Sequence, residues 1–555
     1  MNIRNLYVLF FVFVSSLGQA QNTYTNPILA GFYPDPSICK VEGSYYMITS
    51  TFAYFPGIPI FKSDDLVNWE QIGNVLDRPE QLDLDGLGVS RGIFAPAIRF
   101  KDGLYYITGT VVDGKNNFVV TASDPSGPWS DPVWIPEVNG IDPSMFFDTD
   151  GKAYIIYNST APSNKPLYDG HRTIKINEFD IHKLKVVSEQ KILINGGADF
   201  SKKPIWIEGP HIFKKNGYYY LIAAEGGTAE GHSEVVFRSK DVLGPYESYD
   251  KNPILTQRHL NPNREFPVTS IGHVDIVETD HGDWFGVFLG CRPYDNDHYN
   301  TGRETFMAPI KWKDNWPMFD LGGDSVKYNY PTPSNVINES KGFQYSGNFS
   351  FKEDFDHTDL GYNWLFLRTP KDKWFEIKKG LIEIETRPES CSEKENPSFI
   401  GHRQQHSKGS VTVLMKFTAE KENEKSGLVI FQNESHYYYL CKSVKNKIPV
   451  LQLFRSSEIT MEEIVSTPIF SENYVRLKIV ANNDTYDFLY AEDQEDWKLL
   501  KSGIDAKFVS TKVAGGFVGA IYGMYTTSLG NKSNNSAVFD WFEYKGNDEM
   551  YKKKK

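Results

Sequence analysis

The chain of 555 residues has only four cysteines, Cys39, Cys291, Cys391 and Cys441, and they lie far apart. They form no Cys-x-x-Cys pair, so neither a disulfide framework nor a zinc site is indicated. The sequence does not decide whether a single disulfide bridge forms within either half of the chain. Beyond the N-terminus no run of 18 apolar residues occurs, which argues against a membrane-spanning helix. Basic residues are also few: 59 Lys and Arg stand against 71 Asp and Glu, a net charge of −12. We therefore expect no nucleic-acid partner, because such a partner requires a basic surface.

One short apolar run is present at the N-terminus. It covers residues 6–14, follows Arg4 and precedes the small-residue site Gly18-Gln19-Ala20. A basic start, a short apolar stretch and a small-x-small end are typical of a secretory signal peptide, predicted here over residues 1–20. We therefore expect an exported protein, periplasmic or extracellular.

Aromatic residues are plentiful, at 14% of the chain, and many lie in short runs bounded by Asp-Gly, Asn-Gly or His-Gly turns. Such runs favour β-strands, whereas long helical periodicity is scarce. Five turn–strand segments resemble one another, with matched aromatic residues at Tyr45, Tyr105, Tyr154, Tyr218 and Trp284. The steps between them are 60, 49, 64 and 66 residues. A unit of several strands repeated five times indicates a five-bladed β-propeller.

A second predicted strand starts 10 to 12 residues before each aromatic marker. The matched residues near its start are Asp35, Ala95, Asp142, Glu208 and His273. In a propeller the first strand of each blade lines the central channel, so we expect these side chains to converge on one axis. Three of the five are carboxylates, which repel one another at close range, so stability alone does not favour them there. Their convergence indicates a functional site.

Converging carboxylates with unequal pKa values suit glycoside hydrolysis. A protonated acid protonates the departing oxygen, and an ionised carboxylate activates water or attacks the sugar. A third carboxylate can raise the pKa of the acid by repulsion. Glu208 is the candidate acid, because it lies among apolar neighbours in Trp206-Ile-Glu-Gly-Pro-His211, and Asp35 is the candidate base.

Four ordered motifs carry these residues. They are Asn26-Pro-Ile-Leu-Ala-Gly-Phe-Tyr-Pro-Asp-Pro-Ser37, Gly140-Ile-Asp-Pro-Ser144, Trp206-Ile-Glu-Gly-Pro-His211 and Gly302-Arg-Glu-Thr-Phe306. Together they resemble glycoside hydrolase family 43, and most closely its β-xylosidase/α-L-arabinofuranosidase branch. The resemblance implies an inverting mechanism that requires no cofactor. It also implies Asp35 as general base, Glu208 as general acid, and Asp142 as the residue that tunes and orients Glu208.

The same resemblance implies roles for further residues. Arg303 matches the arginine that binds sugar hydroxyls, and its planar fork suits two adjacent oxygens. Phe52 and Phe94 match aromatic walls of the first sugar subsite, although many relatives have Trp where this chain has Phe94. His273 matches a channel histidine that often lies beside a hydrated calcium ion or an ordered water. Phe517 is the candidate from a C-terminal loop that helps close the pocket.

The second half of the chain has a different pattern. Residues 328–335 are rich in proline and polar residues, as in an extended linker. Period-two alternation follows to about residue 545, which predicts an antiparallel β-sandwich, and its motifs resemble the concanavalin-like jelly roll of the same branch. The all-β chain is thus divided into a signal peptide (1–20), propeller (21–325), linker (326–348), β-sandwich (349–546) and charged tail (547–555).

The expected function is exo-acting removal of terminal xylose, as a β-1,4-xylosidase, or of α-L-arabinofuranose, or of both. The expected partners are oligosaccharides derived from xylan or arabinoxylan, and the oligomeric state is left open. A strict α-L-arabinofuranosidase or an endo-arabinanase on the same fold is an alternative. A non-catalytic carbohydrate-binding propeller is a third hypothesis, but such a protein would tolerate loss of an acid, and this chain keeps all three.

Overall fold

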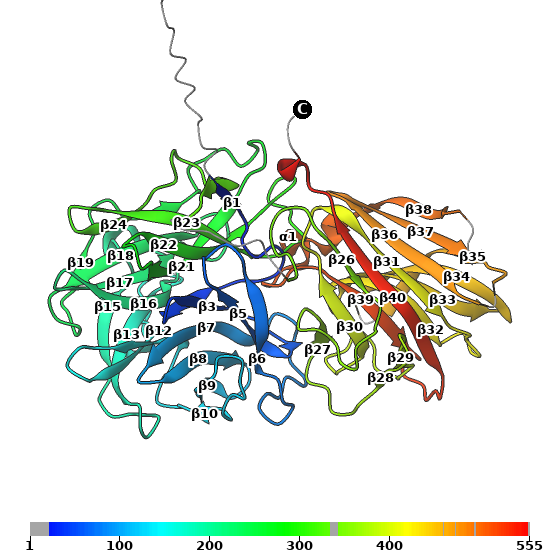
Figure 1. Ribbon diagram of the computed structural model, residues 1–555, viewed down its shortest axis with the longest axis horizontal. Helices are drawn as coiled ribbons and strands as arrows, with labels where there is room; N and C mark the ends of the chain where they lie inside the picture. The colour runs from blue at the N-terminus through cyan, green and yellow to red at the C-terminus, as the bar shows by residue number, and fades with distance from the viewer. Residues whose placement is uncertain (1–21, 334–341, 459, 472, 493–495, 553–555) are drawn as a thin grey trace, which may run out of the picture.

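The computed structural model describes residues 22–333, 342–458, 460–471, 473–492 and 496–552, so the predicted signal peptide and part of the predicted linker lie outside it. Two β-rich bodies lie side by side (Figure 1). The longest α-helix of the described residues is the single turn α1 (Thr511–Ala514). Four short 3-10 helices accompany it: η1 (Pro162–Asn164), η2 (Phe200–Lys202), η3 (Ala506–Val509) and η4 (Glu549–Tyr551). No helix in this part of the chain is both long enough and apolar enough to cross a membrane.

The N-terminal body is a propeller of five antiparallel blades, which confirms the fold predicted from the repeat. Blade one contains β2 (Ser37–Val41), β3 (Ser44–Ile48), β5 (Gly57–Ser63) and β6 (Glu70–Leu76). Blade two contains β7 (Gly92–Lys101), β8 (Leu104–Val112), β9 (Asn116–Ala122) and β10 (Val133–Trp134). Blade three contains β11 (Ile141–Phe147), β12 (Ala153–Thr160), β13 (Arg172–Asp180), β14 (Lys185–Val186) and β15 (Lys191–Asn195). Blade four contains β16 (Glu208–Lys215), β17 (Tyr218–Glu225), β18 (Ser233–Ser239), β19 (Glu247–Ser248) and β20 (Leu255–Thr256). Blade five contains β21 (Thr269–Glu278), β22 (Trp284–Cys291), β23 (Glu304–Lys313) and β24 (Trp316–Phe319).

The first strands of neighbouring blades contact one another around the ring, in the order β2, β7, β11, β16, β21. The five aromatic markers all lie in the second strands, and Tyr45, Tyr105 and Tyr154 belong to the apolar cores of the propeller. The N-terminal strand β1 (Thr23–Thr25) pairs with β25 (Asn329–Pro331), inside the predicted linker, and Leu29 pairs with Thr305 of blade five. These pairings hold both ends of the propeller segment together.

The C-terminal body is a sandwich of two eight-stranded antiparallel sheets around one large apolar core, as the alternating pattern predicts. One sheet contains β26 (Ser350–Glu353), β28 (Phe375–Ile377), β29 (Ile382–Glu385), β31 (Lys408–Lys416), β36 (Val475–Asn482), β37 (Thr485–Glu492), β38 (Lys498–Asp505) and β40 (Ser536–Gly546). The other contains β27 (Leu365–Leu367), β30 (Ser398–Arg403), β32 (Lys425–Asn433), β33 (His436–Lys445), β34 (Ile448–Ser457), β35 (Thr460–Pro468), β39 (Ile521–Thr527) and β4 (Tyr54–Phe55).

One strand of this second sheet comes from the propeller. β4 lies in the blade-one segment between β3 and β5, and it pairs with β27 at the edge of the sandwich. The outer face of the same sheet packs on Phe32 and Phe52, which are propeller residues. The two bodies therefore share both a hydrogen-bonded edge and an apolar core.

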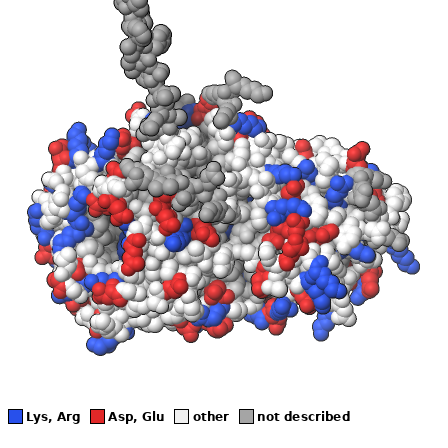
Figure 2. All heavy atoms as spheres, viewed as in Figure 1, with Lys and Arg blue, Asp and Glu red and all other residues white. Residues whose placement is uncertain are grey.

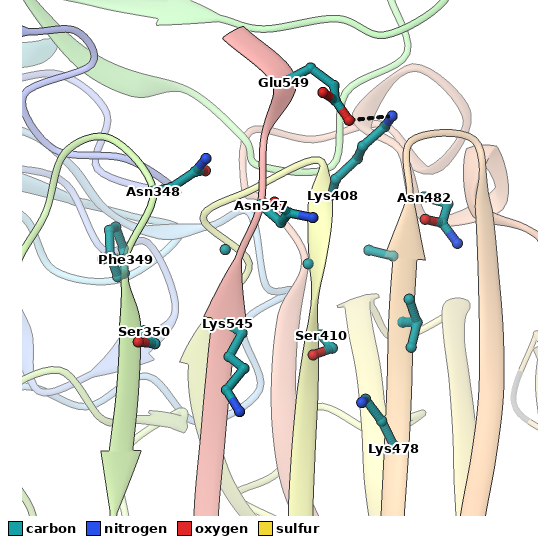
Figure 3. A pocket seen from close by; sticks show the side chains of 14 residues that line it. Asn348, Phe349, Ser350, Lys408, Ser410, Lys478, Asn482, Lys545, Asn547 and Glu549 are labelled. Carbon is teal, nitrogen blue, oxygen red and sulfur yellow. Dashed lines mark hydrogen bonds and ion pairs between the residues drawn. The ribbon is translucent and has the colours of Figure 1, made fainter. Parts of the chain in front are cut away.

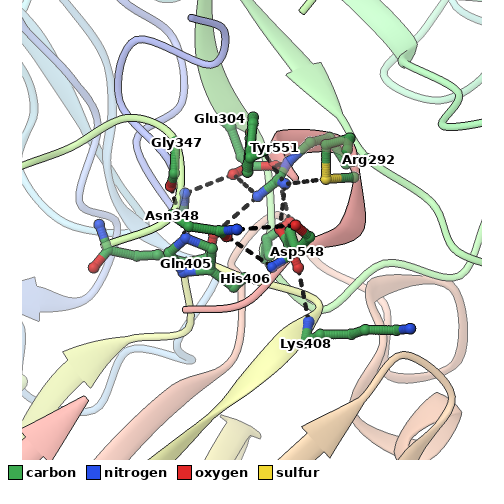
Figure 4. Close-up of polar contacts among 12 residues, drawn as sticks. Arg292, Glu304, Gly347, Asn348, Gln405, His406, Lys408, Asp548 and Tyr551 are labelled. Atoms are coloured by element: carbon green, nitrogen blue, oxygen red, sulfur yellow. Dashed lines mark hydrogen bonds and ion pairs between the residues drawn. The ribbon is translucent and has the colours of Figure 1, made fainter. Parts of the chain in front are cut away.

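A buried ionic cluster also joins the two bodies (Figure 4). Arg292 donates hydrogen bonds to both carboxylate oxygens of Glu304 at 2.6 and 2.8 Å, to Asp548 Oδ2 at 2.7 Å and to the Gln405 carbonyl oxygen at 2.9 Å. Asp548 is only 1% exposed, although it belongs to the segment expected to be a charged tail. Its burial is explained by the pairing, because a carboxylate paired with a buried guanidinium is stabilised away from water.

Charged side chains are distributed over both bodies. On the face viewed in Figure 2, basic and acidic residues of the described chain are interspersed. All four cysteines are buried and free, so none of them forms a disulfide bridge.

Candidate active site

A pocket of about 520 Å³ lies where the first strands of the five blades meet. The matched residue of every blade lines it: Asp35, Ala95, Asp142, Glu208 and His273. The other residues predicted for the site line the same pocket: Phe52, Phe94, Arg303 and Phe517. The convergence expected from the sequence repeat is thus found in one cavity, of a size common for small-ligand sites.

Irregular backbone turns the matched side chains toward the pocket. In blades two to five, a β-bulge interrupts the first strand at or beside the matched residue. Asp35, Asp142 and His273 have φ values of 53°, 55° and 56°, in the left-handed region. Bulges and non-glycine residues of positive φ gather at active sites, where they re-aim a side chain at a cost in strain. The irregular backbone at the start of the first strands therefore directs the matched side chains into the pocket.

Asp35 is held by one hydroxyl and faces two nitrogen-bearing groups. Its Oδ2 accepts a hydrogen bond from Ser50 Oγ at 2.6 Å. Its Oδ1 lies 4.0 Å from Arg303 Nη1 and 4.0 Å from His273 Nδ1. The guanidinium thus places a positive charge beside the Asp35 carboxyl group.

Glu208 and Asp142 have environments that favour the protonated form. Burial raises the pKa of Glu208 well above its usual value, and the neighbouring Asp142 carboxylate raises it further. Burial raises the pKa of Asp142 to about 6; His273 opposes the rise, whereas Asp35 adds to it. Asp142 Oδ2 also accepts a hydrogen bond at 3.1 Å from the backbone N–H of Gly209, directly after Glu208. Asp142 is therefore placed to influence both the charge and the position of Glu208.

Gly209 allows His273 to pack against this pair. A Cβ at Gly209 would lie 2.8 to 3.0 Å from the His273 ring, and its φ of 56° is disfavoured for larger residues.

The described residues form no group of three or more His, Cys, Asp or Glu suited to a metal ion. Asp275, which follows His273 on β21, is already paired with Arg99 at 2.8 Å. Because calcium requires several oxygen ligands, these residues do not fit a directly bound calcium ion.

Three aromatic rings and Arg303 form the wall on the sandwich side. Phe52 lies 4.9 Å from Phe94 and 5.8 Å from Phe517, between ring centroids. The Arg303 guanidinium lies 4.8 Å from the centre of the Phe517 ring. Phe517 reaches the pocket because its loop seats on the propeller: its N–H donates to Ser90 Oγ at 2.9 Å. A Cβ at Gly516 would lie 2.2 Å from the same hydroxyl, so only glycine fits this approach.

Among the lining residues that were not predicted, four have charged or aromatic side chains: Arg91, Arg172, Trp206 and His232. Trp206 could have been found, because it stands two residues before Glu208 in a recognised motif. Arg172 begins the third strand of blade three, and no sequence signal points to it. Its guanidinium lies 4.6 Å from the Trp206 ring, and it interacts electrostatically with Asp142 and Glu208.

A hollow of about 650 Å³ over β31, β36 and β40 of the sandwich offers a contrast (Figure 3). Lysines Lys408, Lys478 and Lys545 line it, together with one carboxylate, Glu549. That carboxylate is bonded to Lys408 at 3.3 Å. Acid–base hydrolysis of a glycoside needs two carboxyl groups, so the propeller pocket, not this hollow, has the required chemistry.

Comparisons with known proteins agree with this chemistry. Residues 24–317 match the model of glycosyl hydrolases family 43, and residues 352–545 match that of the β-xylosidase C-terminal concanavalin A-like domain. The chain belongs to glycoside hydrolase family 43. It is therefore a glycoside hydrolase, as the motifs and the three carboxylates led us to expect.

Individual relatives cover nearly the whole chain. A xylosidase/arabinosidase of Butyrivibrio fibrisolvens is 37% identical, over 93% of this chain and 98% of its own. A non-reducing end α-L-arabinofuranosidase of Bacteroides ovatus is 34% identical, over 98% of both chains. Among solved structures, a GH43_12 protein from a capybara gut metagenome is 41% identical with a TM-score of 0.86, over 91% of this chain and 95% of its own.

Proposed function

We propose that this family 43 enzyme removes single terminal sugars, xylose or α-L-arabinofuranose or both, from oligosaccharides of xylan or arabinoxylan, with inversion. One observation carries the proposal: three buried carboxyl groups share one pocket that the sandwich closes on one side. An exo-acting enzyme needs such an end wall, whereas an endo-arabinanase needs an open cleft. Relatives named for both xylosidase and arabinosidase activity support the two candidate sugars.

In this proposal Asp35 acts as the general base. Its carboxylate, oriented by Ser50 and faced by Arg303, takes a proton from the attacking water. Glu208 stays protonated near neutral pH because burial and Asp142 raise its pKa, so it can give its proton to the departing oxygen. After the products leave, Asp35 loses the proton that it took from the water and Glu208 regains a proton from the solvent, so each group keeps its role, and the mechanism needs no covalent intermediate. We expect their oxygens to lie about 6.5 to 9.5 Å apart, which leaves room for the water.

Arg303 and the aromatic wall would hold the terminal sugar. The guanidinium fork can donate to two adjacent hydroxyls, and its Nε has no hydrogen-bond partner within the described residues. Phe52, Phe94 and Phe517 provide apolar surface for a sugar ring. No step requires a metal ion, and a hydrated calcium beside His273 stays a prediction, to be checked by metal analysis of the purified protein.

Two nitrophenyl glycosides test the proposal directly. The purified enzyme should hydrolyse the β-xyloside, the α-L-arabinofuranoside or both, and Asp35→Asn should lower kcat by about 10²-fold or more. The matched control is Asp83→Asn, which removes an exposed carboxylate in a loop and should leave kcat unchanged. No hydrolysis of either glycoside, or full activity in Asp35→Asn, would overturn the proposal.

We also propose that the enzyme is exported, because residues 1–20 have the composition of a signal peptide. N-terminal sequencing of the mature protein, recovered from the periplasm or the medium, should begin after Ala20. An intact N-terminus in the cytoplasmic fraction would contradict this.

A further inference from the structure

The catalytic pocket is closed on the sandwich side but bordered by partly exposed residues on the side of blades three and four. Phe517 and its two ring contacts form the closed wall. On the opposite side Arg172, Ile205 and Trp206 line the pocket, and Ile205 is 52% exposed. Because Ile205 is the most exposed of the lining residues, a saccharide whose terminal sugar is in the pocket is expected to leave the enzyme over blades three and four.

The position of Glu208 favours the same direction. A general acid lies beside the oxygen that it protonates, so the leaving saccharide begins next to Glu208. The Trp206 side chain opposes the rise in the pKa of Glu208, and Arg172 packs on the Trp206 ring at 4.6 Å. Trp206 and Arg172 are therefore the first groups that the leaving saccharide meets.

Arg172 is preorganised for this contact. Its Nε and one terminal nitrogen donate to Asn158 Oδ1 at 3.1 and 2.5 Å, and Asn158 in turn donates to the Ile207 carbonyl oxygen. The guanidinium is thus fixed along one edge and packed on an aromatic face. An arginine held in this way loses little side-chain entropy when its remaining N–H groups bind a ligand.

A second hollow, of about 550 Å³, adjoins the pocket at this point. It is lined by Arg172, Trp206 and residues of the segment between β12 and β13, including Leu167, Tyr168 and His171. Tyr168 stacks on His171 at 4.8 Å, and its hydroxyl donates to the Gly196 carbonyl oxygen at 3.2 Å. Leu167 is 72% exposed. Apolar faces beside fixed polar groups are what a neutral sugar ring needs for binding.

We infer that this second hollow binds the distal sugars of the leaving saccharide, with Arg172 contacting the sugar that is released next to Glu208. The inference rests on the proposed function and adds to it a leaving-group site that extends over blade three. The ligand class is a neutral pentose oligosaccharide that continues beyond the cleaved bond. The enzyme should consequently favour longer leaving groups over the shortest ones.

Chain length provides the test. The wild-type kcat/KM should be about tenfold higher for a substrate with a two-sugar leaving group than for one with a one-sugar leaving group, equivalent to about 1.4 kcal/mol. Xylotriose and xylobiose give this ratio for xylosidase activity, and arabinosyl-xylobiose and arabinosyl-xylose give it for arabinofuranosidase activity. Equal kcat/KM values within each pair would overturn the inference, and this arm needs no variant.

Two variants locate the effect. Tyr168→Ala should bring the ratio close to one, because it removes an aromatic ring that lines the hollow. Tyr362→Ala is the matched control, since Tyr362 is 52% exposed on the sandwich and should leave the ratio at the wild-type value. An unchanged ratio in folded Tyr168→Ala would place the distal sugars elsewhere and contradict the inference. Activity on nitrophenyl glycosides distinguishes the two failures: if it is absent the proposed function fails, and if it is present without chain-length dependence only this inference fails.

Discussion

Removing the Phe517 side chain tests whether the sandwich shapes the active site. Phe517→Ala deletes a stacked contact with Phe52, an edge contact with Phe94 and the ring under Arg303 at 4.8 Å. A desolvated cation–π contact contributes about 1 to 2 kcal/mol, and each aromatic pair about 0.5 to 1.5 kcal/mol. If only the contact with Arg303 is needed in the transition state, kcat/KM falls by about 5- to 30-fold.

The assay is kcat/KM on whichever nitrophenyl glycoside the enzyme prefers, with a thermal melt of each variant. Phe517→Tyr keeps the ring and should stay within about twofold of the wild type. Phe470→Ala is the matched control, because Phe470 is 89% exposed on the sandwich. If Phe517→Ala is folded and also stays within twofold, the sandwich does not contribute to the pocket, and the reasoning from the aromatic wall is wrong.

Three further predictions concern charge. Asp142→Asn should move the alkaline limb of kcat/KM to lower pH, because losing the Asp142 charge lowers the pKa of Glu208; an unmoved limb in a folded variant would make Asp142 a turn residue only. Glu208→Gln should slow xylobiose about 10²- to 10⁴-fold more than an activated nitrophenyl xyloside, whereas equal losses would exclude Glu208 as the acid. Arg292→Met should destabilise the fold by about 3 to 5 kcal/mol, because it leaves two buried carboxylates unpaired. Burial raises the pKa of Glu304 and Arg292 lowers it, so removing Arg292 raises this pKa further in the folded state. The loss of stability in thermal melts should therefore be greater at pH 8 than at pH 5. The control Lys311→Met breaks an exposed ion pair and should change the melting temperature little at either pH.

The repeat made the central part of the site predictable. Each blade reuses one strand pattern, so aligning the blades places Asp35, Ala95, Asp142, Glu208 and His273 at equivalent positions, and all five line the pocket. Equivalent positions in a closed ring must face one axis, so this inference needs no side-chain detail. Phe517 lies more than 300 residues from Glu208 in the sequence. Only the family resemblance indicated that its loop reaches the pocket.

Contacts between elements that share no pattern could not be predicted. Arg172 enters the pocket because β13 begins beside Trp206, and nothing in its local sequence distinguishes it from a surface arginine. The pairing of β4 with β27 joins two short strands more than 300 residues apart, too short for a period-two signal. Asp548 was assigned to a charged tail because composition alone does not reveal the buried Arg292 that it meets.

The stereochemistry of the first product tests the central claim most directly, that Asp35 activates water against a bond that Glu208 protonates. Proton NMR of the fresh reaction mixture distinguishes the anomers before they interconvert. Inversion predicts α-xylose as the first product of a β-xyloside, or β-L-arabinofuranose as the first product of an α-L-arabinofuranoside. Initial release of the anomer with the same configuration as the substrate would mean a covalent intermediate, and it would contradict the roles given to Asp35 and Glu208.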